Sequence, residues 1–502
     1  MFLIFDTETT GLPQNYNAPV SDIENWPRMV QLAWQVHAAD GSLIEVKNYI
    51  VKPEGYTIPF NSEKIHGIST ERALQEGHDL QFVLGEFKKA ISQSEFFVGH
   101  NIEFDIKVVG AEIFRLTQKD ALSQFPYIDT KDESTDYCAL PGGKGGKFKW
   151  PTLTELHQKL FGNDFDAAHN AAADVEATAR CFLDLVRVGM ITQQKMGVDD
   201  EFMRVFKEKN PDVIQPIGLA VKDFHEEDKL EATSVAEIKK ENTDVDFDYS
   251  GFFHLHTHSQ FSVLQATPTV DDLVSRAKIN GMKAVAMTDH ANLMGAFHFV
   301  KKALSEDIKP IIGCEFHLCS DRLNKANKDN GFQVILLAKN KTGYHNLLKL
   351  VSASFTEGFY YVPRIDRELL LQYKQDLIAL SGWIYGEIPS LILNQGEKQA
   401  IEAVDWWKEN FGDDFYFELN RHGLKEEEVV NEFLIQQAKE KDIKLIAANN
   451  VYYIHKEDAE THDVLLCVRD GELKSTPIGK GRGLRWGFPN NEIYFKIQDE
   501  MA

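Results

Sequence analysis

Three short acidic blocks in the first third of the chain constrain its fold more than any other feature. The first, Asp6-Thr7-Glu8, directly follows an apolar run at residues 2–5, the second ends in Asp105, and the third ends in Asp174. A short apolar run of this kind is typical of a buried strand. Because alternate residues of a strand point the same way, Asp6 and Glu8 are expected to share one face.

The second and third blocks are predicted to place carboxylates near helix starts. Asn101 is the expected N-cap of a helix that carries Asp105. Its predicted apolar face consists of Phe104, Val108, Ala111 and Leu116. His169 cannot share a helical face with Asp174, because five residues place them about 140° apart around the axis. We therefore expect His169 in a loop and Asp174 in the first turns of the next helix. That helix is expected to bury Val175, Ala179, Phe182 and Val186.

These side chains suit hydrolysis of a phosphodiester by two metal ions. Mg²⁺ and Mn²⁺ prefer carboxylate oxygens, so the predicted ligand set is Asp6, Glu8, Asp105 and Asp174. Two such ions about 3.5–4 Å apart clamp the attacking and leaving oxygens. With an ordinary pKa near 6.5, His169 can accept a proton from the attacking water. Each block alone is also explained by an ordinary strand or capped helix, but all three in order favour a catalytic site.

The three blocks resemble the DEDDh 3′→5′ exonucleases over about residues 1–188. The resemblance implies a ribonuclease-H-like α/β fold and release of 5′-mononucleotides from a 3′ end. It assigns catalysis to Asp6, Glu8, Asp105, His169 and Asp174, with two Mg²⁺ or Mn²⁺ ions as cofactors. It also suggests substrate contacts from Thr7, Thr9 and His66, although a lone histidine is equally explained as a solvated or hydrogen-bonded side chain.

A glycine-rich basic loop at residues 142–150 separates the second and third blocks. Its lysines, Lys144, Lys147 and Lys149, are expected to contact phosphates of a frayed strand. Phe148 or Trp150 could stack on a base. The alternative is an ordinary solvated loop.

A second constellation follows an acidic stretch at residues 223–248, which reads as a linker. Three apolar segments then lead to His256 and His258, to His290, and to Glu315. In a parallel α/β barrel, residues at the C-terminal strand ends converge on one site. We therefore expect these four side chains to meet.

This half resembles the PHP domain of bacterial DNA polymerase III alpha subunits. The resemblance implies a distorted barrel of parallel strands and, where intact, a three-metal phosphoesterase site. His256, His258, His290 and Glu315 stand at ligand positions. Other ligand positions carry Gln265, Gln333, Trp383, Asn450 and Tyr452. Amides are weak ligands and an indole cannot coordinate, so we predict a vestigial site without metal and a structural role. A second hydrolytic or proofreading centre is the alternative.

Length and composition agree with an α/β protein of two domains joined by a linker. The expected boundaries are 1–190 for the exonuclease domain, 191–250 for a helical and acidic linker, 251–470 for the PHP domain, and 471–502 for a segment leading to a polymerase palm. The five cysteines form no C-x-x-C pair, which is typical of reduced cytoplasmic thiols. No apolar stretch reaches the length of a membrane span, so no membrane partner is expected.

The net charge of −23 argues against a protein that binds nucleic acid strongly by itself. Physical linkage to a polymerase would supply the substrate at high effective concentration. The expected function is the proofreading module of a replicative DNA polymerase III alpha chain. Its expected partners are a single-stranded or frayed DNA 3′ end, polymerase domains in cis, and replisome subunits such as the sliding clamp. The alternatives are a self-standing exonuclease or oligoribonuclease with a PHP appendage, and a non-catalytic replisome assembly module.

Overall fold

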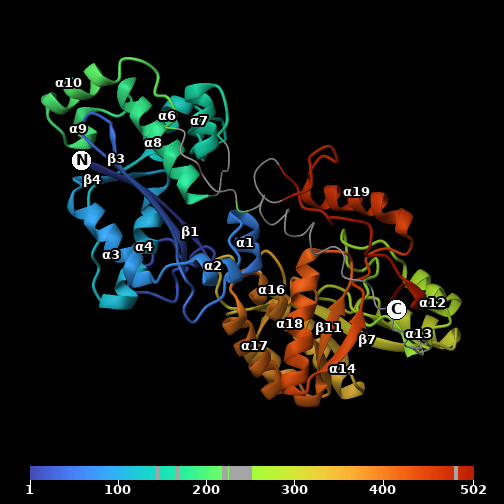
Figure 1. Cartoon of the computed structure of the whole chain (residues 1–502). Coiled ribbons are helices and arrows are strands. Elements are labelled where there is room, and N and C mark those ends of the chain that lie inside the picture. The colour runs from blue at the N-terminus through green and yellow to red at the C-terminus, as the bar shows by residue number, and fades with distance from the viewer. Residues whose placement is uncertain (143–145, 166–169, 218–223, 225–250, 480–483, 502) are drawn as a thin grey trace, which may run out of the picture. The chain divides into compact units, whose positions relative to one another are not determined.

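The computed structural model describes residues 1–142, 146–165, 170–217, 224, 251–479 and 484–501 (Figure 1). The chain divides into two compact units, Met1–Lys240 and Glu241–Ala502. Each unit has its own hydrophobic cores, so each is described by itself. Among the described residues, no helix has both the length and the apolar character needed to cross a bilayer.

The first unit is a five-stranded sheet covered by helices on both faces. Its strands are β1 (Phe2–Thr9), β2 (Met29–His37), β3 (Leu43–Ile50), β4 (Phe96–Gly99) and β5 (Tyr127–Asp129). Its helices are α1 (Phe60–His66), α2 (Thr70–Glu76), α3 (Leu80–Ser92), α4 (Ile102–Thr117), α5 (Thr130–Glu133), α6 (Thr135–Cys138), α7 (Leu153–Phe161), α8 (Ala171–Arg187), α9 (Gln193–Met196) and α10 (Asp200–Lys209).

The strand order β3-β2-β1-β4-β5 places β1 at the centre of this sheet. β2 runs antiparallel to β1, whereas β4 and β5 run parallel to it. Phe2 and Ile4 pack in the core that contains α8, and Leu3 and Phe5 pack in the core that contains α3 and α4. β1 is therefore apolar on both faces, which is why its sequence reads as a continuous apolar run. Asp6 and Glu8 alternate in step with Phe2 and Ile4, so they lie on the face of β1 that α8 covers.

Several local expectations for this unit are met, and others differ. α4 begins directly after Asn101, as predicted, but the Asn101 side chain makes no capping hydrogen bond. Asp174 lies in the first turn of α8, as predicted. Leu116 does not join the apolar face of α4, since 44% of it is exposed near the end of the helix. Beyond residue 190, α9 and α10 bury Met196 and Phe206 in the α8 core. These helices therefore pack with the first unit, although the sequence suggests a linker there.

The second unit is a seven-stranded mixed sheet with helices around it. Its strands are β6 (Ala284–Met287), β7 (Lys309–Cys319), β8 (Phe332–Ala338), β9 (Arg364–Asp366), β10 (Leu377–Leu380), β11 (Phe415–Asn420) and β12 (Lys444–Ala448). Its α-helices are α12 (Val270–Ile279), α13 (Ala296–Ser305), α14 (Lys341–Thr356), α15 (Arg367–Tyr373), α16 (Glu387–Asn394), α17 (Glu397–Phe411), α18 (Lys425–Lys441), α19 (Ala459–Asp470) and α20 (Gln498–Met501). Two 3₁₀ turns, Gly412–Asp414 and Lys456–Asp458, complete it.

This sheet runs β12-β11-β10-β8-β7-β6, and β9 pairs with β7. β6–β7, β10–β11 and β11–β12 are parallel pairs, as the resemblance implies. β8 runs antiparallel to both β7 and β10, so the barrel is not built of parallel strands alone. The mixed α/β class is confirmed for both units.

The chain near residue 494 packs into the second unit. The amide N–H of Tyr452 donates to the carbonyl of Ile493, and that of Phe495 donates to the carbonyl of Tyr453. Ile493 and Phe495 are almost fully buried. This part of the segment expected to lead away from the PHP domain therefore belongs to its core.

Candidate active site

β1 and α8 bring three carboxylates together at one point of the first unit. One ligand oxygen each from Asp6, Glu8 and Asp174 lies within 4.8 Å of the others. Asp6 and Glu8 point the same way because they alternate along β1, and Asp174 lies in the first turn of α8. α8 packs across β1 and β2, so its first turn meets the end of β1. The predicted convergence of these three residues is seen in the fold.

Gln31 holds the start of α8 in place. It is fully buried on β2, directly opposite Glu8 in the β1–β2 register. Its Oε1 accepts from the backbone N–H of Ala171 at 3.2 Å, and its Nε2 donates to Oδ1 of Asn48 at 2.9 Å. The side chain of Asn170 caps α8 by accepting from the N–H of Ala172 at 3.0 Å. Sequence reasoning missed Gln31, because nothing local links residue 31 to residue 171.

Asp105 enters from α4 and is tied to the strand between the two β1 carboxylates. Its Oδ1 accepts from the backbone N–H of Thr7 at 3.0 Å and from the hydroxyl of Thr7 at 2.6 Å. Asp105 is not in the tight group of three, but it is buried and its charge acts on Asp6 and Glu8. Thr7, expected to contact substrate, here positions a carboxylate.

The site carries an excess of buried negative charge. Burial, and then the charges of Asp105, Asp174 and Glu8, raise the pKa of Asp6 well above its usual range. Burial and the charges of Asp174 and Asp105 do the same to the pKa of Glu8. Burial raises the pKa of Asp105 to about 7, although the bonds from Thr7 oppose this. A divalent cation would relieve this repulsion, so the donor set fits hard metal ions.

The structure describes some of the remaining predicted residues of this site and not others. His169 and Lys144 fall outside the described residues. His66 ends α1, is buried, and accepts from the N–H of Ile68 through Nδ1 at 3.1 Å, so it is not a solvated loop side chain. The hydroxyl of Thr9 donates to the carbonyl of Gly11. Lys147 is exposed, whereas Lys149 forms an ion pair with Glu155.

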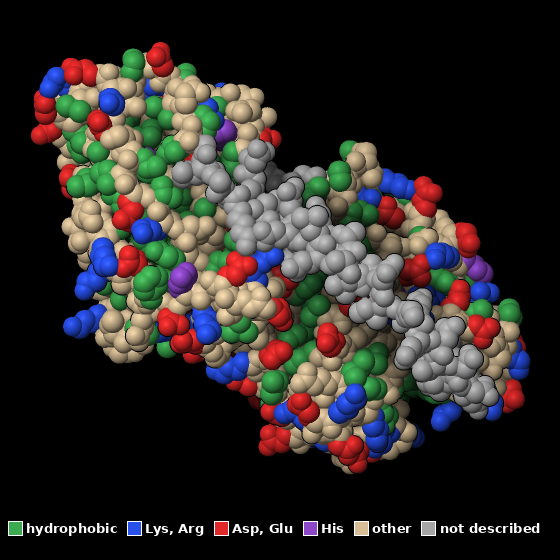
Figure 2. Space-filling view, viewed as in Figure 1, with side chains coloured by type: hydrophobic (Ala, Val, Ile, Leu, Met, Phe, Trp, Pro, Cys, Tyr) green, Lys and Arg blue, Asp and Glu red, His purple; other side chains and the backbone are tan. Residues whose placement is uncertain are grey.

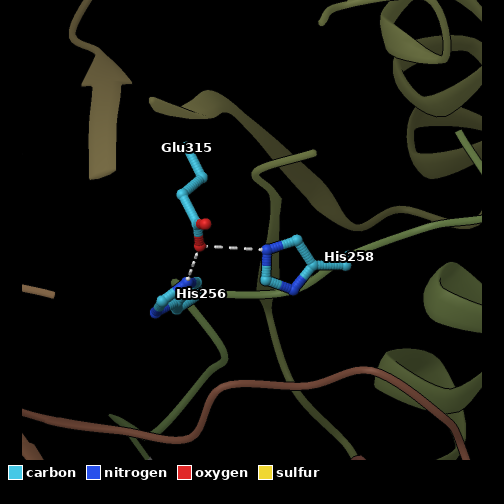
Figure 3. Close-up of side chains that lie close together, drawn as sticks. All are labelled: His256, His258 and Glu315. Carbon is cyan, nitrogen blue, oxygen red and sulfur yellow. Dashed lines mark hydrogen bonds and ion pairs between the residues drawn. The ribbon is translucent and has the colours of Figure 1, made fainter. Parts of the chain in front are cut away.

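The second unit holds the other predicted cluster, in which His256 and His258 point at Glu315 (Figure 3). One carboxylate oxygen of Glu315 lies 2.9 Å from Nε2 of His256 and 3.2 Å from Nε2 of His258. The other oxygen lies 2.7 Å from Nδ1 of His290 and accepts from Nε2 of Gln333 at 2.9 Å. The four predicted residues do meet. Glu315 lies within β7, however, and His256 and His258 lie in irregular backbone rather than at strand ends.

The side chains of this cluster partly offset one another's charge. Burial alone would raise the pKa of Glu315, but the imidazoles of His290, His256 and His258 bring it well below its usual range. Burial opposes charge on His256 too, yet Glu418 and Glu315 raise its pKa to about 10. Burial and the charge of His290 lower the pKa of His258 to about 4. His256 is therefore protonated at neutral pH beside Glu315, although one ligand atom each from His256, His258 and Glu315 lies within 4.8 Å of the others, close enough to hold a metal ion.

Four of the five residues that replace expected metal ligands make hydrogen bonds or ring contacts, whereas the buried side-chain amide of Asn450 has no hydrogen-bond partner among the described residues. Gln333 donates to Glu315, and the indole N–H of Trp383 donates to Glu427 at 2.6 Å. The ring of Tyr452 stacks on His258 with centroids 4.3 Å apart, and its hydroxyl lies 3.2 Å from Nε2 of His290. The backbone carbonyl of Gln265 lies 2.6 Å from Nε2 of His462.

Glu418 is a cluster member that sequence reasoning missed. It lies in β11, is 1% exposed, and places Oε2 3.3 Å from Nδ1 of His256. The available signal was a charged residue within the apolar run of β11. Charged residues are rarely buried unless paired, so this position predicts a buried partner.

The face of the molecule drawn in Figure 2 carries charges of both signs. Figure 2 shows Lys and Arg side chains interspersed with Asp and Glu on the visible face, with no continuous basic stripe over its described part. This distribution agrees with the net charge of −23.

Comparison with known proteins assigns a family to each unit. Residues 3–182 match the family described as Exonuclease, and residues 254–422 match the family described as PHP domain. This chain is 43% identical to DNA polymerase III subunit alpha of Borreliella burgdorferi over 257 residues. The match covers 50% of this chain and 22% of that protein. The subunit from Aquifex aeolicus is 43% identical over 260 residues, and that from Thermus aquaticus 41% over 257 residues, each again over 50% of this chain. The matches cover 22% and 21% of those two proteins, so the chain spans about a fifth of these relatives.

Proposed function

We propose that this chain, which joins an exonuclease domain to a PHP domain, is the metal-dependent 3′→5′ proofreading module of a DNA polymerase III alpha chain. The observation that carries the proposal is the convergence of Asp6, Glu8 and Asp174, whose ligand oxygens lie within 4.8 Å of one another. Such a group is costly without a cation and is what a nuclease needs around the scissile phosphate.

Each side chain of the first unit has a distinct task in this proposal. Asp6, Glu8 and Asp174, with Asp105 beside them, hold two divalent ions, Mg²⁺ or Mn²⁺. When bound, these ions supply a nucleophilic water at neutral pH and stabilise charge on the phosphate oxygens. Thr7 orients Asp105 through its N–H and hydroxyl. His169 is proposed to take the proton from the attacking water, and His66 and Thr9 to contact the terminal nucleotide.

The substrate is proposed to be a single-stranded or frayed DNA 3′ end. Mixed surface charge gives little intrinsic affinity, so polymerase domains in the same polypeptide would supply the strand. Lys147 is exposed and available for a phosphate, together with Lys144, whereas Lys149 must first leave Glu155. A sliding clamp and other replisome subunits are further proposed partners. Converging carboxylates argue against the alternative of a non-catalytic assembly module.

The PHP domain is proposed to act as a scaffold rather than a hydrolase. Gln333 satisfies Glu315, and Tyr452 covers His258 and His290, so the substituted positions stabilise the remaining polar side chains without a metal. The expected limits of 1–190 and 251–470 are proposed to widen. The helices at 193–209 pack with the first domain, and Ile493 and Phe495 lie in the core of the second.

Digestion of a 5′-labelled single-stranded DNA tests this function. The full chain with Mg²⁺ should shorten the strand stepwise from its 3′ end and release 5′-mononucleotides. Asp6→Ala should abolish the reaction, and His169→Ala should slow it about 10²–10⁴-fold, the usual contribution of a general base. His256→Ala serves as a control in the other domain and should leave the rate unchanged. A wild-type rate in Asp6→Ala would show that the site is wrongly assigned, and faster digestion of RNA would favour the oligoribonuclease alternative.

A further inference from the structure

An exposed tryptophan is tied to the loop that leads into α4. The imidazole of His100 lies 3.0 Å from the hydroxyl of Thr130 through Nδ1 and 3.0 Å from the carbonyl of Pro151 through Nε2. Burial lowers the pKa of His100 to about 4, so the ring is neutral at physiological pH. Because His100 immediately precedes the N-cap of α4, this bridge fixes Trp150 beside the helix that carries Asp105.

Lys131 supports the tryptophan ring. Its Nζ lies 2.8 Å from Oδ1 of Asn101 and 4.9 Å from the ring centroid of Trp150. The lysine side chain is only 19% exposed. Asn101 is itself fixed, since its backbone N–H donates to Oδ1 of Asp129 at 2.8 Å. An ammonium over an aromatic face is attractive, and here it fixes the tilt of the ring.

The other side of the ring is available for contact. Trp150 is 65% exposed although the lysine ammonium lies over one face, so most of its remaining surface meets solvent. A large aromatic ring held in one orientation and left open is what stacking on a nucleobase requires. Phe148, on the same segment and 47% exposed, is the competing candidate, but its ring makes no aromatic or cation–π contact among the described residues, whereas that of Trp150 lies under Lys131.

We propose that Trp150, supported by Lys131, is a base-stacking platform for the single strand whose 3′ end is hydrolysed at Asp6, Glu8 and Asp174. The proposal rests on the proposed function and adds a binding subsite to it. Asn101 is one helical turn from Asp105, so the contacts through Asn101 and Lys131 place the ring within roughly 20 Å of that carboxylate. At about 3.4 Å or more per nucleotide, the stacked base is expected within about six nucleotides of the 3′ end.

Abasic scanning of the substrate tests the platform. Single abasic sites are placed at each of the last six nucleotides of a single-stranded DNA, and the KM for digestion by the full chain is measured. Trp150→Ala should raise the KM about 10-fold on the intact strand, the usual effect of losing one stacked base. For the wild type, one abasic position should raise the KM by a similar factor. On the substrate that is abasic at that position, Trp150→Ala should not raise the KM further.

Matched variants separate stacking from other effects. Trp150→Phe should retain most of the wild-type affinity, and Phe82→Ala, which removes a 48% exposed aromatic from α3, should change nothing. Lys131→Met should raise the KM by a smaller factor, and its effect should largely vanish in the Trp150→Ala background, because the two residues act together. In every variant kcat should stay within about two-fold of wild type.

Two results would overturn the proposal. One is an unchanged KM in Trp150→Ala. The other is a rise in KM that occurs in Phe148→Ala instead of Trp150→Ala. Binding of a fluorescein-labelled single strand in EDTA distinguishes this failure from failure of the proposed function, because it needs no hydrolysis. If the chain does not cleave DNA but Trp150→Ala still weakens this binding about 10-fold, the platform stands and the catalytic assignment falls.

Discussion

Replacing Asp105 by Asn should stabilise the metal-free chain while destroying its activity. Asp105 is 3% exposed, and burial raises its pKa to about 7. Asn keeps the Oδ1 atom that accepts from the N–H and hydroxyl of Thr7. The substitution therefore removes a buried negative charge at little cost in hydrogen bonding.

The pKa gives the size and direction of the effect. The rise from the usual value of 3.8 to about 7 spans roughly three pKa units at about 1.4 kcal/mol each, which gives an upper figure of about 4 kcal/mol. Between these values the folded state holds a proton that the unfolded state has lost. The stabilisation from neutral Asp105 is therefore complete below about pH 4 and is lost as the pH rises through about 7.

Urea unfolding of the full chain in EDTA, at pH 5 and pH 8, measures this effect. Hydrogen exchange of peptides from β1 and α4 reports the first unit separately from the second. We expect Asp105→Asn to exceed the wild type by about 2–4 kcal/mol at pH 8 and to approach it at pH 5. Asp132→Asn is a control, since 59% of that side chain is exposed. Added Mg²⁺ should stabilise the wild type but not Asp105→Asn.

Comparison with the variant reports Asp105 together with its effect on Asp6 and Glu8, because the other acidic groups are common to both proteins. Equal stability of the two proteins at pH 8 would contradict this prediction. A difference in stability that grows, rather than shrinks, as the pH falls would contradict it too.

Three further predictions concern other parts of the chain. Replacing Lys144, Lys147 and Lys149 together by Ala should raise the KM for DNA more than it lowers kcat and should flatten the salt dependence; an unchanged KM would remove the loop from the DNA path. Gln31→Leu should lower kcat about 10-fold with little change in KM, because the N–H of Ala171 loses its acceptor at the start of α8; an unchanged kcat would separate Gln31 from catalysis. His256→Ala combined with His258→Ala should leave exonuclease activity unchanged. It should lower the free energy of unfolding of the second unit by about 1–3 kcal/mol per lost hydrogen-bond partner. A phosphoesterase activity that is lost only in this variant would show that the PHP site is catalytic.

Local patterns were sufficient to predict much of the exonuclease site. The alternation of β1 fixed the direction of Asp6 and Glu8, and helix periodicity placed Asp174 at the start of α8. The resemblance to an exonuclease and a PHP domain is confirmed. These features depend on residues a few positions apart, which is the range over which periodicity carries information.

What the sequence could not supply depends on contacts between distant segments. Gln31 reaches Ala171 across 140 positions, and Thr7 reaches Asp105 across 98. The antiparallel course of β8 and the approach of Glu418 to His256 are set by sheet order, which no short motif encodes. In the described structure, Lys149 is paired with Glu155, whereas Lys131, outside the basic loop, supports Trp150.

The two buried clusters differ in how their charge is balanced, and this difference favours a catalytic role for the first and a structural role for the second. At Asp6 and Glu8, the charged groups that shift the pKa are all acidic, so the site gains stability from cations. At Glu315, three imidazoles and the amide of Gln333 already surround the carboxylate. A metal ion arriving there would have to displace donors that are in place and compete with an imidazolium. We therefore propose that the Glu315 cluster is a polar core that packs without a metal, while catalysis depends on the first unit, where the charge remains uncompensated.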